Sequence, residues 1–427
     1  MNLIKNNRHR NYIILFLEGI FFHVGLVFFD ASTILPLLMN KFTDSSILVG
    51  LLGMAPGFSM GITAVLAGNY GRSLPYKKKF ILTASSVGRL SLWILGLSLI
   101  FIPFTNPFFW AGLILFIQYL FWLADGAVFT AWSDLINKSI SERLRGRFLS
   151  LVQIVGGTIA IFAGKYVTKI LKIDFLSFPT NYGVIITIGA LLFTFSIIMF
   201  ASVREQDRSS TSKSDSPREL IKKIPVYFRS SAGFSRAMLT LFFCTLATIA
   251  LPFFIVYAEK SFGLAESTVG AFVSLRIGGR IIGALAFGFV GDRLGHEKSI
   301  TIFALSASIP AFMALIVKTW MPDLVILGLF YMIFLFIGIM QAGAWMAFMN
   351  YTIDLVAGNQ LTLFAGFIQL VRVPASVAPF FGGLIANTGG YLTVFVLSAI
   401  FALIGTYFSL ILPAAERTGG ISENGNS

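Results

Sequence analysis

Long runs of apolar residues, separated by short polar or Gly- and Pro-containing segments, dominate the chain. Most runs reach the roughly 20 residues that an α-helix needs to cross the hydrocarbon core of a bilayer. Each run therefore predicts a membrane-spanning helix, so the sequence indicates an all-α membrane protein with about twelve transmembrane helices. The expected spans lie near residues 12–38, 47–68, 80–103, 107–133, 148–170, 179–202, 235–257, 268–290, 299–317, 322–350, 363–387 and 390–412.

Composition agrees with this class. Of the 427 residues, 56% are hydrophobic and 12% are charged, and the mean hydropathy is +0.83. A soluble domain has about 45–50% apolar and about 25% charged residues. The formal net charge of +13 would suggest nucleic acid as a partner of a soluble protein. In a membrane protein the position of the basic residues matters instead, so we expect a lipid bilayer around the chain and no nucleic-acid partner.

One long polar segment divides the spans into two sets. Residues 204–234 hold a serine-rich part and then a basic, partly amphipathic part, which is typical of a linker at a membrane surface. The two sets also repeat each other, because DSSILVGLL and GNYGRSLPYKK align with LAESTVGAF and GFVGDRLGHEK at one offset. The expected parts are an N-terminal six-helix bundle (1–203), a cytoplasmic linker (204–234), a C-terminal six-helix bundle (235–413) and a cytoplasmic tail (414–427).

Basic residues indicate the orientation in the membrane. The amino terminus, the linker and the loops after even-numbered spans carry most of the Lys and Arg, although Lys165, Lys169 and Lys172 lie between spans five and six. The positive-inside rule then places both termini in the cytoplasm. The basic start resembles a secretory signal, but the apolar run after it is too long and contains ionisable residues. We expect a multi-pass protein of the cell inner (plasma) membrane.

The segment GFVGDRLGHEK, from Gly288 to Lys298, resembles the signature loop of the major facilitator superfamily, at the place where that family has it. Span number, central basic linker and internal repeat extend the resemblance to essentially the whole chain. It implies two pseudo-symmetric bundles that alternate access around a site between them. It also implies a cytoplasmic gate in which an aspartate meets the start of span five. The implied gate residues are Gly288, Asp292, Arg293, Gly295, Arg145 and Arg147.

The amino-half copy of this loop departs from the family pattern. Arg72 stands at the position that corresponds to Asp292, and the start of span eleven has no basic residue. A matching gate there would need other contacts, or a reversed pair between Arg72 and Asp354.

Ionisable side chains inside the expected spans are functional candidates, because charges are costly to bury in lipid. A carboxyl group that alternates between apolar and arginine-bound surroundings can bind and release a proton. Asp30 is one such candidate, and a permanent pair with Arg276, in which Asp30 would not bind a proton, is an equal alternative. Arg89 is expected to pair with Asp125 or Glu18. The candidates for proton coupling are Asp30, Glu18, Asp125 and His23.

Arginines and amides in or near the spans are candidates for substrate binding. Arg276 and Arg280 are four residues apart on one helix face, so they repel unless an acid or an anion lies opposite. An anionic substrate is therefore one option. The amides could equally join neighbouring helices. The full set is Arg276, Arg280, Arg372, Gln369, Gln153 and Gln118.

Together these features favour a secondary active transporter of a small solute, with protons as the expected coupling ion. The chain has no GxxxxGK[ST] segment, so we expect no direct use of a nucleotide. Export of amphipathic compounds and import of small polar solutes both stay open. A non-transporting receptor or scaffold on the same fold is the alternative. A membrane-embedded enzyme is disfavoured, because the three histidines and one cysteine lie apart, so we expect no catalytic residues, metal or cofactor.

Overall fold

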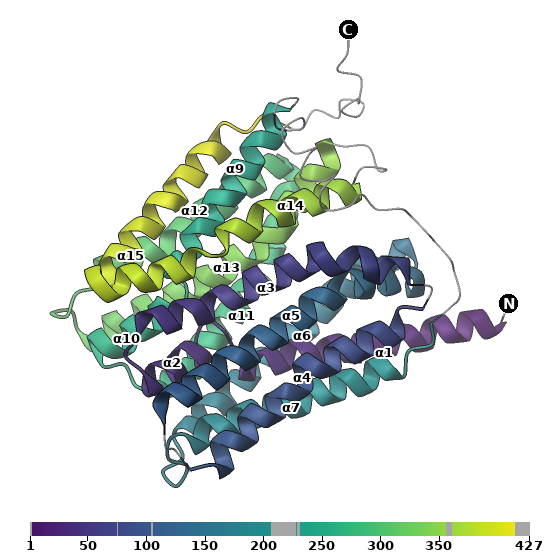
Figure 1. The fold of residues 1–427 in the computed structure, drawn as a ribbon. Helices are drawn as coiled ribbons and strands as arrows, with labels where there is room; N and C mark the ends of the chain where they lie inside the picture. The colour runs from purple at the N-terminus through teal and green to yellow at the C-terminus, as the bar shows by residue number, and fades with distance from the viewer. Residues whose placement is uncertain are drawn as a thin grey trace. The chain divides into compact units, whose positions relative to one another are not determined.

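The computed structural model describes residues 2–74, 76–103, 106–205, 228, 231–355 and 361–414. All regular elements among these residues are helices (Figure 1). The chain forms two compact units: unit 1 is Met1–Lys213 with Pro252–Ile277, and unit 2 is Ser214–Leu251 with Gly278–Ser427. The division into bundles at 1–203 and 235–413 stays a prediction. Most of the expected linker and tail lies outside the described residues.

Unit 1 contains the first six expected spans. In it α1 packs against α6 and α7, α3 packs against α5, and α4 packs against α5 and α7. The elements are α1 (Asn2–Phe28), α2 (Ile34–Phe42), α3 (Ser46–Ser73), α4 (Lys78–Phe101), α5 (Pro107–Ser139), α6 (Glu142–Leu171), α7 (Thr180–Ala201), α10 (Phe253–Phe262), the short 3-10 helix η2 (Glu266–Thr268) and the first part of α11 (Val269–Leu294).

Unit 2 contains the remainder of α11 and the helices of the carboxyl-terminal part. Here α12 packs against α13 and α15, and α15 packs against α9. The only cysteine of the chain, Cys244, lies in this core with 1% of its surface exposed, as a small buried residue. The elements are α9 (Ala232–Leu246), the 3-10 helix η1 (Ala247–Ala250), α12 (His296–Ile316), α13 (Asp323–Leu355), α14 (Leu361–Ala375) and α15 (Ala378–Leu410).

The described residues contain 11 helices long and apolar enough to cross a membrane. One of them, Phe367–Leu410, has 44 residues, and at 1.5 Å per residue it would be about 66 Å long, twice the hydrocarbon thickness. It is not one straight helix, because α14 ends at Ala375 before α15 begins at Ala378, and Gly390 inside α15 has a positive φ of 74° and non-helical geometry. This segment therefore corresponds to the two expected spans at 363–387 and 390–412, and the all-α membrane fold is confirmed.

The first expected span, residues 12–38, is interrupted. Helix α1 ends at Phe28 and α2 begins at Ile34. Between them Asp30 Oδ1 accepts hydrogen bonds from Ser32 N at 2.9 Å and Thr33 Oγ1 at 2.7 Å. Such side-chain to backbone bonds compete with helix formation. Asp30 therefore lies in a short loop between α1 and α2, and not within a continuous helix over residues 12–38.

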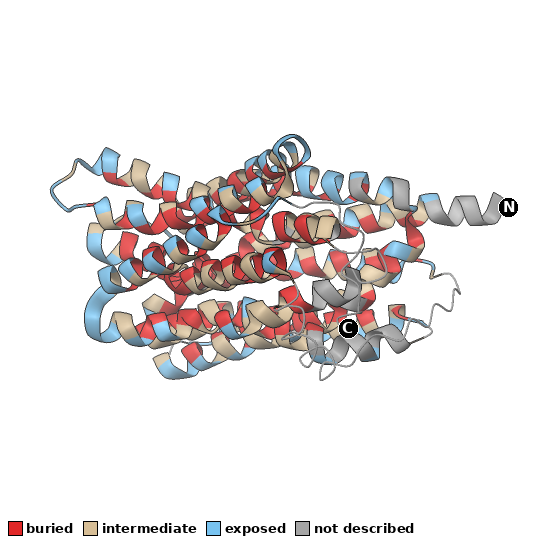
Figure 2. Cartoon of the chain, turned by 90° about the horizontal axis from the view of Figure 1, so that it is seen from above, coloured by how far each residue is buried: buried red, intermediate tan, exposed pale blue. Residues whose placement is uncertain are grey.

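The outer faces of many helices are apolar. In Figure 2, buried positions alternate along the helices with intermediate and exposed ones. Large apolar side chains are among the most exposed, including Leu66 at 65%, Phe116 at 62% and Leu285 at 62%. Apolar surface on this scale suits contact with lipid, because the backbone polar groups of each helix are satisfied internally.

Candidate functional site

Asp30 and Arg276 form a buried ion pair in unit 1. The guanidinium of Arg276 contacts Asp30 Oδ2, and its Nη1 donates to Ser32 Oγ at 3.1 Å. The two side chains are 5% and 10% exposed. With its other oxygen bound by Ser32 and Thr33, the Asp30 carboxylate is held from both sides. Of the two roles expected for Asp30, this geometry matches the pair with Arg276.

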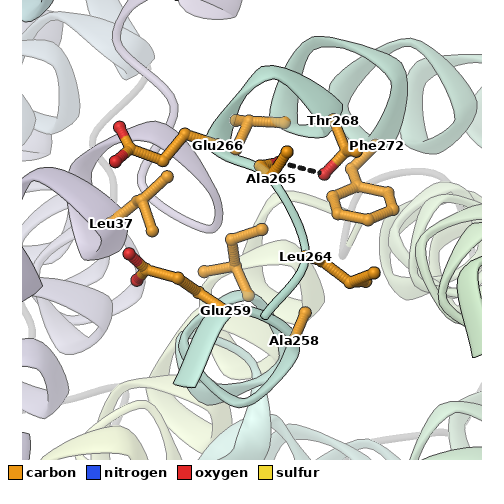
Figure 3. Close-up of a pocket in the computed structure, with 10 residues that line it drawn as sticks. Leu37, Ala258, Glu259, Leu264, Ala265, Glu266, Thr268 and Phe272 are labelled. Carbon is orange, nitrogen blue, oxygen red and sulfur yellow. Dashed lines mark hydrogen bonds between the residues drawn. The ribbon is translucent and has the colours of Figure 1, made fainter. Parts of the chain in front are cut away.

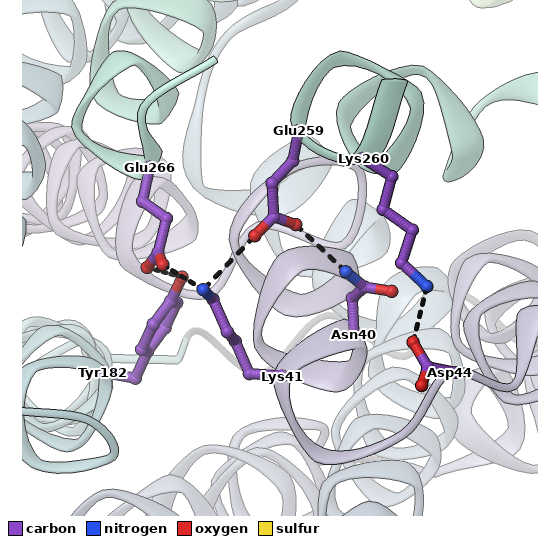
Figure 4. Close-up of polar contacts among 7 residues, drawn as sticks. All are labelled: Asn40, Lys41, Asp44, Tyr182, Glu259, Lys260 and Glu266. Carbon is purple, nitrogen blue, oxygen red and sulfur yellow. Dashed lines mark hydrogen bonds and ion pairs between the residues drawn. The ribbon is translucent and has the colours of Figure 1, made fainter. Parts of the chain in front are cut away.

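A second set of charges joins the end of α2 to α10 and η2, all within unit 1 (Figure 4). We call Lys41, Asp44, Glu259, Lys260 and Glu266 the α2–α10 cluster. Lys41 Nζ lies 3.3 Å from Glu259 Oε1 and also contacts Glu266. Lys260 Nζ lies 2.8 Å from Asp44 Oδ1. Asn40 donates to Glu259 and Tyr182 donates to Glu266, each at 3.0 Å.

The electrostatics of the α2–α10 cluster are those of a partly hydrated ion network. Burial lowers the pKa of Lys41, but the hydrogen bond and charge of Glu266, together with Glu259, outweigh burial and raise it. The hydrogen bond from Lys260, and then its charge, lower the pKa of Asp44. The Lys41 and Glu259 side chains are 32% and 21% exposed, and Asp44 is 96% exposed. These pairs can separate and re-form at modest cost.

Beside this cluster is a pocket with about 170 Å³ of open space, which Figure 3 shows among Leu37, Ala258, Leu264 and Phe272. Ligand pockets usually enclose about 300–1,000 Å³, whereas this one has almost no space that a water molecule could enter. The pocket is therefore too small for a typical substrate, and it marks only imperfect packing next to Glu259 and Glu266.

Helices α6 and α11 cross very closely in unit 1. A Cβ atom added to Gly270 would collide with the carbonyl oxygen of Gly164, and one added to Gly164 would collide with Ser274 Oγ. Ser274 Oγ donates to the Ile161 carbonyl at 2.7 Å. Small residues at such a crossing let two membrane helices approach backbone to backbone.

A third set of charges lies inside the spans of unit 1. Arg89 Nη1 is 3.6 Å from Glu18 Oε1, and Arg89 Nη2 is 3.4 Å from Asp125 Oδ1. Ser196 Oγ accepts from Arg89 and donates to Glu18, both at 3.0 Å. The guanidinium also lies 4.7 Å from the centre of the Phe22 ring. Arg89 was expected to pair with one of the two acids, and in the structure it contacts both.

The remaining candidates lie on different helices: His23 on α1, Gln118 on α5, Gln153 on α6 and Gln369 on α14. His23 Nδ1 lies 2.7 Å from the Gly19 carbonyl oxygen on its own helix. Gln153 is exposed and Gln369 half-buried. Gln118 is fully buried, and neither amide atom has a hydrogen-bond partner among the described residues.

Arg280 and Arg372 are both half-buried in unit 2. Neither forms an ion pair or a hydrogen bond from its guanidinium with any residue that the structure describes. Arg276, by contrast, belongs to unit 1 and is neutralised by Asp30. The expected pair of Arg276 and Arg280 therefore divides into one neutralised and one unneutralised arginine.

The signature segment forms the end of α11 and the turn to α12. Gly295 has φ 98°, a conformation that favours glycine. Arg293 lies 4.6 Å from the centre of the Phe289 ring, while Asp292 is exposed. A Cβ at Gly288 would meet nothing within 4 Å.

On α6, Arg145 donates to the Asn137 carbonyl at 3.3 Å and Arg147 is exposed. The gate between Asp292 and these arginines stays a prediction. In the amino-half copy, the side chain of Arg72 lies outside the described residues, and Asp354 contacts His296 Nδ1.

Sequence reasoning missed the α2–α10 cluster and the pair of His296 with Asp354. A usable signal was present for the first. The segments NKFTD and AEKSFGLAE each carry acidic and basic residues, and the topology expected from the sequence places both on one side of the membrane. The described residues hold no group of three His, Cys, Asp or Glu side chains arranged to bind a metal ion.

Comparison with known proteins gives one family and one fold. Residues 236–425 match the model of the Major Facilitator Superfamily. A crystal structure of the nucleoside transporter NupG is 13% identical with a TM-score of 0.69, covering 95% of this chain and 99% of its own. A D-xylose-proton symporter is 12% identical with a TM-score of 0.70, covering 97% and 100%. A bacterial homologue of the human lysosomal transporter Spinster, inward-facing and occupied, is 13% identical with a TM-score of 0.65, covering 94% and 96%. No curated protein matches the chain.

Proposed function

Because residues 236–425 match the model of the major facilitator superfamily and the fold is that of its solved transporters, we propose that the chain is a secondary active transporter of a small solute and not an enzyme. It works by alternating access and is coupled to protons. The observation that supports this best is the composition of unit 1, in which Pro252–Ile277 packs with the first six spans. These residues come from the predicted second bundle, so their contacts are those that a closed gate would make.

The character of these contacts supports a gate that opens and closes. Partly exposed ion pairs contribute only about 0–1 kcal/mol each, so the α2–α10 cluster can break without unfolding the helices. The crossing at Gly164 and Gly270 is tight enough to exclude a solute while it lasts. By the distribution of basic loops, this gate lies on the outer side of the plasma membrane, and both termini lie in the cytoplasm.

The substrate that we propose is a small anionic solute. Arg280 and Arg372 lie inside spans of unit 2, with no acid paired to them among the described residues. Intramembrane arginines face the bundle interior or a water-filled cavity and need a counter-charge. A carboxylate or phosphate group of the substrate would supply that charge. The proposal holds for import and for export.

The test is flux in proteoliposomes containing the purified full-length protein. Small carboxylates and phosphate esters are screened first by thermal shift, and the hits are offered with a pH gradient across the membrane. We expect accumulation of at least one anion, and Arg280→Gln should weaken its binding by roughly tenfold to a hundredfold, the value of one charge-assisted hydrogen bond. The exposed Lys318→Gln, which removes one positive charge elsewhere, is the matched control. Binding without flux would instead favour the receptor or scaffold alternative.

A further inference from the structure

The cluster of Glu18, Arg89 and Asp125 does not balance its charge. Two carboxyl groups face one guanidinium at 3.6 Å and 3.4 Å. The side chains of Glu18, Arg89 and Asp125 are only 4%, 10% and 15% exposed. If both acids were ionised, one net negative charge would remain inside the membrane, away from water. Buried charges in membrane spans are paired or lost.

Among the described residues, no other charged side chain forms an ion pair with this cluster. The cluster is formed from α1, α4 and α5, and α7 contributes Ser196. The only ionisable side chain of α7 is Tyr182, at its first turn. The charged residues of α3 and α6 lie towards their ends. On α1, His23 lies more than one turn from Glu18, with Nδ1 at the Gly19 carbonyl.

The Asp30 pair shows the opposite arrangement. There one carboxylate meets one guanidinium, and both oxygens have partners. Asp30 and Arg276 are therefore neutral as a pair, and a proton on Asp30 would leave Arg276 uncompensated. Arg89, in contrast, is shared between two carboxyl groups.

We propose that the Glu18–Arg89–Asp125 cluster binds one proton, shared between its two carboxyl groups, and is the coupling site of the transport cycle. The role of the cluster in coupling rests on the proposed function, but the presence of the bound proton does not. Asp125 is the more exposed acid, so the proton enters and leaves there. When Asp125 is protonated, Arg89 pairs with Glu18 and Ser196. When the proton leaves, the cluster carries its excess negative charge until the next proton arrives.

The first experiment needs no substrate. Infrared spectra of the purified full-length protein at pH 7, in H₂O and D₂O, report the carbonyl stretch of protonated carboxylic acids. We expect such a band in the wild type. Glu18→Gln and Asp125→Asn should each abolish it, because either change leaves one acid balanced by Arg89. Asp30→Asn and the exposed Asp323→Asn should leave it unchanged.

Two results would overturn the assignment. One is a wild-type spectrum without the band, which decides the matter even if a variant folds poorly. The other is a band that survives in Asp125→Asn or in Glu18→Gln, because charge balance would then not govern the proton.

A second experiment connects the proton to transport. Glu18→Gln and Asp125→Asn should both lose accumulation of substrate driven by a pH gradient while they retain exchange of substrate across the membrane. If the wild type shows the band but no flux, the proposed function fails and the proton site stands. If the variants still accumulate substrate under a pH gradient, the cluster is not the coupling site.

Discussion

The α2–α10 cluster and the Glu18–Arg89–Asp125 cluster both pair carboxylates with basic side chains, but in different surroundings. In the first, Lys41 and Glu259 are 32% and 21% exposed and every cation has a nearby acid. Acids outnumber cations in both clusters, but in the second Glu18 is only 4% exposed. Water weakens and screens the first set, whereas the second cannot shed its excess charge to solvent. Because it is exposed, the α2–α10 cluster is suited to repeated separation of its ion pairs. Because it is buried, the Glu18–Arg89–Asp125 cluster is suited to holding a proton.

The largest effect should come from Arg89→Ala. Removing one member of a buried charge set costs about 3–5 kcal/mol, because the remaining charge is uncompensated. We expect a large drop in the unfolding temperature of the detergent-purified protein, with partial rescue in Arg89→Lys. An Arg89→Ala protein as stable as the wild type would mean that Glu18 and Asp125 do not depend on the guanidinium.

The next effect concerns the crossing of α6 and α11. Gly270→Val places side-chain atoms where the Gly164 carbonyl lies, so the two helices cannot approach. We expect roughly a hundredfold loss of transport, about 3 kcal/mol, in a protein that remains folded. Gly112→Val is the control, because nothing lies within 4 Å of its Cβ position. Equal transport by both variants would show that the crossing plays no part in the cycle.

A smaller effect is expected within the α2–α10 cluster. Lys41→Met should lower transport several-fold without altering the unfolding temperature, since partly exposed pairs contribute up to about 1 kcal/mol each. A double-mutant cycle of Lys41→Met with Glu259→Gln should give coupling of that size, and high salt should reduce it. Additive effects on transport would indicate that the two residues act separately.

The smallest effect should be that of Asp44. Lys260 lowers the pKa of Asp44 in the folded protein. The pair therefore stabilises the contacts of the α2–α10 cluster fully at pH values above the ordinary aspartate pKa. This contribution is lost as the pH falls through the lowered pKa of Asp44. Because Asp44 is almost fully exposed, the change should be slight. Transport of Asp44→Asn should match the wild type in acid and differ marginally at neutral pH. A large difference at high salt would contradict this.

The sequence predicted most of the fold, because lipid imposes long apolar helices that can be recognised one at a time. It also indicated that Arg89 would meet Glu18 or Asp125, since charges inside spans must find partners. It did not predict the break at Asp30, where local hydrogen bonds of Ser32 and Thr33 replace the helix. Nor did it predict the α2–α10 cluster, because which loop tips meet depends on helix packing over about 220 residues of chain.

Cys244 has a practical consequence for measuring these motions. Its thiol is buried and lies where a side chain at Gly405 would have to go, so reagents dissolved in water cannot reach it in the folded protein. Cysteines introduced at exposed ends of helices can then be labelled selectively in the natural chain, without first replacing a native residue. Pairs of fluorescent or spin labels attached in this way would report distances between helix ends during turnover.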